Sequence, residues 1–273
     1  TVATLLLPGL RNLDLIVLAT VLGTAGAWLW GRKVAITDMP QMVALFNGMG
    51  GGSAGAIGAV ELLRFSAQGR APSTITLVLG VVGALIGSVS LAGSLIAWAK
   101  LVGRMDKRYT FPGQQWLNAA VAVVTVACGA MAVYTLAMPW ILAFFVLALA
   151  LGVLLTLPIG GADMPVVISL YNAFTGLAVA FEGYVLGNEA LIVAGMMVGA
   201  AGILLTRLMA KAMNRPISGV LFSNFGGGGA QMQEIGGSMK PIEAADVAAM
   251  MAYAERVVIV PGYGLAVAQA QHK

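Results

Sequence analysis

The chain has 273 residues, of which 59% are hydrophobic and only 10% are charged, and its mean hydropathy is +0.91. A soluble domain has about 25% charged residues, so this chain cannot cover a water-facing surface and must be solvated mostly by lipid. A single cysteine (Cys128) and a single histidine (His272) exclude a disulfide framework and argue against a metal site. The net charge of +4 comes from loop residues, so it reports membrane topology rather than a nucleic-acid surface.

Seven continuous apolar segments predict seven transmembrane helices, without the alternation that barrel strands would show. They lie near 12–31, 38–64, 73–102, 117–137, 140–158, 163–186 and 189–213. Residues 1–7 resemble the tail of another span, and no signal-peptide layout precedes them, so we expect a fragment of a longer protein. The predicted fold over 1–214 is therefore an all-α polytopic bundle of seven or eight transmembrane helices.

Basic residues fall unequally on the two sides if these helices alternate in direction. Nine lie on one side: Arg32, Lys33, Lys100, Arg104, Lys107, Arg108, Arg207, Lys211 and Arg215. Three lie on the other: Arg11, Arg64 and Arg70. The positive-inside rule makes the first side cytoplasmic, so the segment that follows the last span is expected in the cytoplasm.

The composition changes after Arg215. Residues 215–240, which include Gly226, predict a glycine-rich flexible hinge. Residues 241–256 then predict a short helix, and 257–260 predict a buried strand.

A glycine motif follows that strand. Gly262 would permit a tight turn, Gly264 would let a pyrophosphate approach, and the helix beginning near Val267 would direct N–H groups at the phosphates. The pattern alone is a weak signal that an ordinary strand-to-helix turn would also give, but the strand before it and the Ala-rich stretch after it are the required context. Residues 241–273 therefore predict the incomplete start of an α/β, Rossmann-like nucleotide domain.

An internal repeat marks two of the predicted spans. Asp38-Met39-Pro40 leads to Asn47, and Asp163-Met164-Pro165 leads to Asn172, with nine residues from Asp to Asn in both copies. Both copies would enter from the cytoplasmic side, so the repeat is parallel. The aspartates are expected to cap their helices, and proline suits the first helical turn. Repeats of this kind are common in transport folds.

The two asparagines would lie about 13 Å deeper than their aspartates, near the middle of a hydrocarbon core about 30 Å thick. An amide there needs partners. Two interpretations stay open: a relay of water or protons, or inter-helix hydrogen bonds of about 0.6–2 kcal/mol each that fix packing. The hydroxyls of Ser53, Ser169 and Thr175 would extend a relay, although mid-helix hydroxyls usually bond to their own helix.

Two further features, a pair of glutamates and a glycine series, are secondary. Glu61 and Glu182 are expected near the outer helix ends and solvated, with a proton entry point as the alternative. Gly195, Gly199 and Gly202 predict a close helix contact rather than a gate.

Four stretches together resemble the beta subunit of the proton-translocating nicotinamide nucleotide transhydrogenase. They are 38–44 (Asp-Met-Pro-Gln-Met-Val-Ala), 160–172 (Gly-Gly-Ala-Asp-Met-Pro-Val-Val-Ile-Ser-Leu-Tyr-Asn), 211–215 (Lys-Ala-Met-Asn-Arg) and 261–271 (Pro-Gly-Tyr-Gly-Leu-Ala-Val-Ala-Gln-Ala-Gln). The resemblance implies hydride transfer between NADH and NADP+ coupled to inward proton movement across the cell inner (plasma) membrane. It also implies an alpha subunit that binds NAD(H), and a dimer of such sets.

Site residues carry over by position. The resemblance places Asn172 and Asp163 on the proton path, and we group Asn47, Ser169 and Thr175 with them. It places Arg215 at the junction with the hinge, where we add Asp38 and Gly226 as coupling residues. It assigns Gly262, Tyr263 and Gly264 to the NADP(H) site, and we add Val267.

One position departs from the family pattern. Asn47 stands where many members have a histidine that is taken as the titrating proton carrier, and an amide cannot titrate near neutral pH. We expect the carrier on a partner subunit, and we expect this chain alone not to transfer hydride. The rival interpretations are a secondary transporter or channel with a regulatory cytoplasmic nucleotide-binding domain, and a membrane scaffold for another subunit. The sequence beyond Lys273 would discriminate between them.

Overall fold

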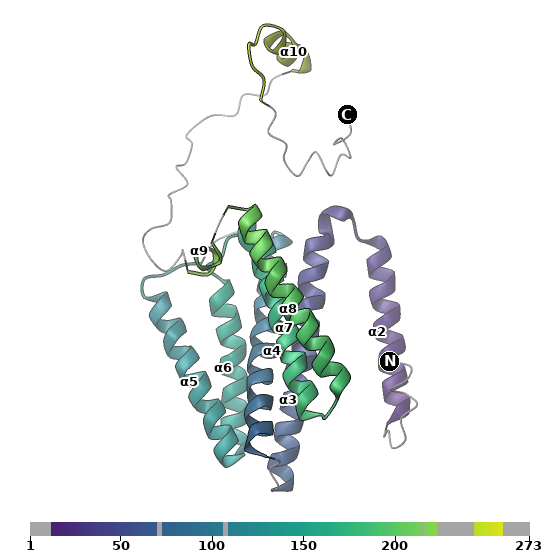
Figure 1. Cartoon of the computed structure of the whole chain (residues 1–273), viewed down its shortest axis with the longest axis vertical. Helices are drawn as coiled ribbons and strands as arrows, with labels where there is room; N and C mark the ends of the chain where they lie inside the picture. Colours follow the sequence, from purple (N-terminus) through teal and green to yellow (C-terminus); the bar gives the residue numbers. More distant parts are fainter. Residues whose placement is uncertain (1–11, 70–72, 106–108, 215, 223–242, 259–273) are drawn as a thin grey trace.

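The computed structural model describes residues 12–69, 73–105, 109–214, 216–222 and 243–258. Within these ranges seven helices are long and apolar enough to cross a membrane, in agreement with the number of spans predicted. They are α2 (Leu13–Lys33), α3 (Met39–Gln68), α4 (Thr74–Leu101), α5 (Gln114–Thr135), α6 (Met138–Thr156), α7 (Met164–Val185) and α8 (Glu189–Ala212). Figure 1 shows them as one upright bundle from which α2 stands apart. Residues 1–7 lie outside the described part.

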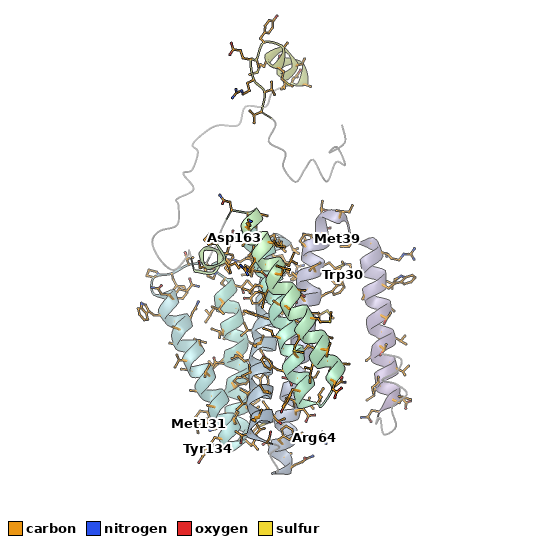
Figure 2. The ribbon with its side chains drawn as sticks, in the orientation of Figure 1. Trp30, Met39, Arg64, Met131, Tyr134 and Asp163 are labelled. Atoms are coloured by element: carbon orange, nitrogen blue, oxygen red, sulfur yellow. The ribbon has the colours of Figure 1, made fainter. Side chains whose placement is uncertain are left out.

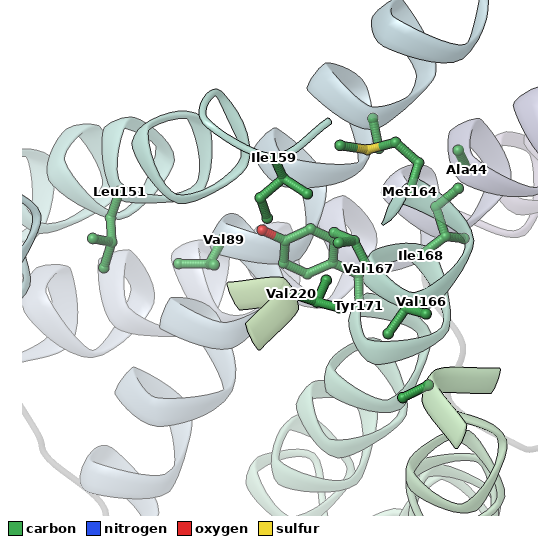
Figure 3. Packing of buried hydrophobic residues seen from close by; sticks show 12 residues of the cluster. Ala44, Val89, Leu151, Ile159, Met164, Val166, Val167, Ile168, Tyr171 and Val220 are labelled. Carbon is green, nitrogen blue, oxygen red and sulfur yellow. The ribbon is translucent and has the colours of Figure 1, made fainter. Parts of the chain in front are cut away.

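Helix α4 is the centre of the bundle, because it contacts α3, α5, α6 and α7. Its sequence is rich in glycine, alanine and serine, and small residues let neighbouring helix backbones approach closely in lipid. Helix α8 packs on the other side of α7. The main apolar cluster gathers around the ring of Tyr171 on α7, against Ile159, Met164 and Val167 (Figure 3).

The parallel repeat is confirmed in the structure. Each copy begins with one turn of 3-10 helix, η1 (Ile36–Asp38) or η2 (Gly161–Asp163), and continues into α3 or α7 with proline in the first turn. Met39 and Asp163 lie at one end of the bundle, opposite Arg64 (Figure 2).

The two aspartates occupy the N-cap positions, but neither side chain makes the predicted cap hydrogen bond. The reason is local backbone geometry. An N-cap residue is normally extended, whereas the preceding 3-10 turn holds Asp38 at φ −97°, ψ −2° and Asp163 at φ −90°, ψ −7°.

The first part of the predicted hinge contains a helix. Ile217–Phe222 form a short helix, α9, which packs against α7 and α8 and whose Val220 is fully buried. Ile217 and Val220 pack in the main apolar cluster of the bundle, so the chain is anchored before the glycine-rich part. Gly226 lies outside the described residues.

The predicted helix within 241–256 is confirmed as α10 (Ala244–Ala252), which buries none of its residues. The strand predicted for 257–260 is not seen at Val257 and Val258, which have no regular structure. A strand needs a neighbour with which to pair, and this segment has none among the described residues. Residues 259–260 lie outside the described part.

Candidate functional site

A polar cluster joins three helices inside the apolar bundle. Asn47 of α3 is 8% exposed, and its Nδ2 donates to Ser94 Oγ at 2.9 Å and to Ser90 Oγ at 3.4 Å, both on α4. Ser90 Oγ in turn lies 2.7 Å from Thr175 Oγ1 of α7 and donates to the carbonyl oxygen of Tyr171 at 3.1 Å. A continuous hydrogen-bonded line therefore crosses from α3 through α4 to α7.

Glycine residues on α3 and α4 allow the two helices to approach closely enough to bring these groups together. A Cβ atom on Gly51 of α3 would lie 2.9 Å from Ser90 Cβ, and one on Gly87 of α4 would lie 2.6 Å from the Gly51 carbonyl oxygen. Real Cβ atoms do not approach so closely, so glycine at both positions lets the α3 and α4 backbones touch. That contact places the Asn47 amide within reach of two serine hydroxyls.

The Asn47 carboxamide is only half satisfied. Its Oδ1 is buried and has no hydrogen-bond partner among the described residues. A buried amide oxygen without a partner costs free energy, so a water molecule or a donor from outside this chain would be favoured there.

Asn172 has a different environment. It is half-buried and lines a mostly apolar cavity of about 430 Å³ between α3, α7 and α8, together with Ser169. Ser169 donates to the carbonyl oxygen of Val166 at 2.8 Å, whereas the Asn172 side chain makes no hydrogen bond within the described part of the chain. Asn47 therefore makes inter-helix hydrogen bonds, whereas Asn172 lines the cavity.

Two charged groups are buried where α7 begins. Asp163 is 2% exposed, and Lys100 at the end of α4 is 7% exposed. The Lys100 ammonium donates to the carbonyl oxygens of Leu157 at 2.5 Å and Ile159 at 2.6 Å. These carbonyls follow α6, so Lys100 ties the α6–α7 connection to α4.

Of the predicted coupling residues, the structure describes Asp38, which is not part of the polar cluster. Asp38 lines a small cavity of about 250 Å³ with Lys33, Gln41 and Trp98. Arg215 and Gly226 lie outside the described residues, as do the predicted nucleotide-binding residues Gly262, Tyr263, Gly264 and Val267. No group of three His, Cys, Asp or Glu residues that could hold a metal occurs in the ranges the structure covers.

One prediction about the carboxylates is wrong. Glu182 is 1% exposed rather than solvated, because the bundle still encloses α7 in its last turn. Glu61 fits the expectation better, since it lies 3.5 Å from the exposed Arg64. Ser53 is exposed and donates to the Met49 carbonyl oxygen at 2.9 Å, so it does not extend the polar line.

Sequence reasoning missed Ser90 and Ser94, the two serines that hold Asn47. Their signal was available, because serines four residues apart share one helix face. The sequence does not show which neighbouring helix that face contacts.

Comparison with known proteins places the chain in a family. The family model for the NAD(P) transhydrogenase beta subunit matches residues 1–273. The chain is 41% identical over 281 aligned positions to the NAD(P) transhydrogenase subunit beta of Rhodospirillum rubrum and, with the same values, to that of a named strain of the same species. The alignment covers 98% of this chain and 60% of the length of each relative. The chain therefore belongs to the NAD(P) transhydrogenase beta subunit family.

Proposed function

We propose that this chain is the proton-conducting membrane part of a transhydrogenase, which couples hydride transfer between NADH and NADP+ to inward proton movement. The observation that carries the proposal is the buried line from Asn47 through Ser90 to Thr175, which joins three helices of a multi-pass bundle. Family membership supplies the reaction.

The hydroxyls of this line suit proton movement chemically. A hydroxyl both donates and accepts, so Ser90 and Thr175 can reverse the direction of their 2.7 Å hydrogen bond without moving apart. The Asn47 amide does not titrate, and its free Oδ1 would instead hold a water molecule at the end of the line. Asn172 and Ser169 would supply the polar partners for water in the neighbouring cavity.

Helix α9 gives the proposed coupling a physical link. Val220 of α9 packs in the same buried cluster as Tyr171, and the carbonyl oxygen of Tyr171 accepts from Ser90. A force on the chain beyond α9 would therefore reach the polar line through two contacts. In the proposed enzyme the nucleotide state would bias this arrangement, and by reciprocity the proton gradient would shift nucleotide affinity.

The remaining assignments belong to the same proposal. NADP(H) would bind at Gly262, Tyr263, Gly264 and Val267, beyond a hinge that includes Arg215 and Gly226. An alpha subunit would bind NAD(H), and two such sets would form a dimer in the inner membrane. The hinge and the C-terminal segment would face the cytoplasm.

Replacement of Asn172 by leucine in the assembled enzyme tests the proposal. The variant Asn172→Leu keeps the side-chain size and removes the polar partner from the cavity. We expect coupled proton transport in proteoliposomes to fall about 100-fold, the low end of the cost of losing a positioned proton-transfer group. The matched control is Asn118→Leu, which makes the same change at a buried asparagine of α5. Intact coupling in Asn172→Leu, or an equal loss in both variants, contradicts a relay role for Asn172.

A further inference from the structure

Glu182 has a buried carboxylate that is not part of the hydrogen-bonded line from Asn47 to Thr175. It lies near the end of the bundle opposite Asp163. Glu182, in the last turn of α7, is 1% exposed, and neither of its carboxylate oxygens has a hydrogen-bond partner among the described residues. An ionisable side chain inside a membrane bundle is costly, and such residues mark ion or proton pathways.

Glycines of two other helices form the cavity for this carboxylate. A Cβ atom on Gly58 of α3 would lie 2.6 Å from Glu182 Oε1, and a Cβ atom on Gly83 of α4 would lie 2.7 Å from the same oxygen. Glu182 therefore occupies space that a side chain at either position would fill. The cradle offers room and no donor, so it accommodates a neutral acid far better than an anion.

Few charged residues lie on the helices around Glu182. On α3, Glu61 lies one turn beyond Gly58 toward the helix end, with its side chain 15% exposed and 3.5 Å from Arg64. Helix α4 carries no charged residue between Thr74 and Ala99, and α6 carries none at all. On α8, which packs against this turn of α7, the acidic residue of the first turn is the exposed Glu189.

Glu182 is also aligned with the polar line. Thr175 and Glu182 are seven residues apart on α7, so they share one face and are separated by about 10 Å along the axis. Between these levels Gly55 on α3 and Gly87 on α4 bring the backbones of the two helices into contact. Exchange of protons between the carboxylate and the hydroxyls would therefore need water to enter between these helices.

We propose that Glu182 is an interior proton-binding site, which takes protons from the non-cytoplasmic end near Glu61 and exchanges them with the Ser90–Thr175 hydroxyls. In this step one carboxylate oxygen accepts a proton and becomes the acid O–H, and release reverses it. The proton donor, a hydronium ion that reaches the site, breaks one O–H bond and leaves as water. The inference rests on the proposed proton translocation, and it gives this chain a titratable group of its own on the path.

The test uses the assembled enzyme in proteoliposomes with three variants. Glu182→Gln keeps the shape and removes the titratable group, Glu182→Asp keeps a carboxyl group, and Glu189→Gln is the control at an exposed carboxylate. We expect Glu182→Gln to lower coupled proton transport about 100-fold. Glu182→Asp should restore part of this rate with a changed pH profile, and Glu189→Gln should match the wild type.

Infrared difference spectroscopy gives a second readout that needs no turnover. The carbonyl band of a protonated carboxylic acid should be present in the wild type and in Glu189→Gln, and absent in Glu182→Gln. Should Glu182→Gln fail to assemble, Glu182→Asp decides: a shifted band with a changed pH profile supports the site, and an unchanged band with wild-type transport overturns it.

Failure of this inference differs from failure of the proposed function. Wild-type transport in Glu182→Gln, or persistence of the band in that variant, overturns the role of Glu182 alone. A wild-type assembly that transfers hydride without moving protons overturns the proton translocation on which the inference rests.

Discussion

At the scale of single residues, a serine hydroxyl holds the deepest amide of α3. Ser94 accepts from Asn47 at 2.9 Å, and both side chains are buried. The variant Ser94→Ala removes this acceptor and leaves Asn47 with Ser90 at 3.4 Å. We expect the free energy of unfolding, measured in mixed detergent micelles, to fall by about 0.6–1.7 kcal/mol, the range for hydrogen bonds between membrane helices.

Ser53 provides the matched control for that prediction. It makes the same residue change possible on α3, but its hydroxyl is exposed and bonds only to its own helix. The variant Ser53→Ala should therefore change the free energy of unfolding by less than about 0.5 kcal/mol. Equal effects of the two variants would mean that the Asn47–Ser94 hydrogen bond contributes nothing specific.

The depth of Asn47 was predictable from the sequence, and its partners were not. A count of residues from Asp38 gives the distance along the helix axis, because the rise per residue is constant. The rotation of each helix about its axis depends on packing against neighbours, which a single sequence does not reveal. The same gap explains Glu182, since its place near a helix end suggested solvent while two glycine-bearing helices in fact enclose it.

At the scale of helices, the contact between α7 and α8 depends on glycine. A Cβ atom on Gly195 of α8 would lie 2.5 Å from the Ala180 backbone nitrogen and 2.6 Å from the Gly176 carbonyl oxygen. These atoms belong to a helix backbone and cannot yield locally. We expect Gly195→Ala to force α7 and α8 apart and to lower the free energy of unfolding by about 1–3 kcal/mol, the usual cost of overpacking.

The control for this contact is a glycine that faces no neighbour within the described chain. Gly26 of α2 has nothing within 4 Å of its added Cβ. Gly26→Ala should not lower the free energy of unfolding and should raise it by at most about 1 kcal/mol, because alanine favours a helix more than glycine does. If Gly195→Ala were as well tolerated as Gly26→Ala, the close packing of α7 on α8 would be wrong.

Helix ends and the short helix α9 mark the limit of prediction for elements. The spacing of Gly195, Gly199 and Gly202 predicted a close helix contact, and the structure shows that α7 is the partner. The 3-10 turns before α3 and α7 gave no sequence signal, and they removed the expected cap geometry of Asp38 and Asp163. Helix α9 forms because Val220 finds a buried site on the bundle, which is a tertiary effect.

For the whole molecule, the seven spans were predictable because lipid imposes their length and composition. The arrangement was not: α4 became the centre, and α2 buries none of its residues within this chain. Among the described residues, Arg32, Lys33, Lys100, Arg104, Arg207 and Lys211 sit in or just after the C-terminal halves of α2, α4 and α8. Those helices end where α3 and α7 begin, while Arg64 lies at the other end (Figure 2). This asymmetry predicts which end of the bundle faces the cytoplasm.

Thiol labelling can test that sidedness, because the sole cysteine, Cys128, is buried and gives little background. The exposed side chains of Lys211 and Arg64 mark the two ends of the bundle. A membrane-impermeant maleimide should label Arg64→Cys in right-side-out vesicles and Lys211→Cys in inside-out vesicles, because the positive-inside rule predicts that the end rich in basic residues faces the cytoplasm. Detergent-solubilised samples, in which both variants should react, control for local accessibility. The reverse labelling pattern would place α9 and the chain beyond it outside the cell. The proposed nucleotide-binding domain would have no nicotinamide nucleotide to bind there, so this result would contradict the proposed coupling as a whole.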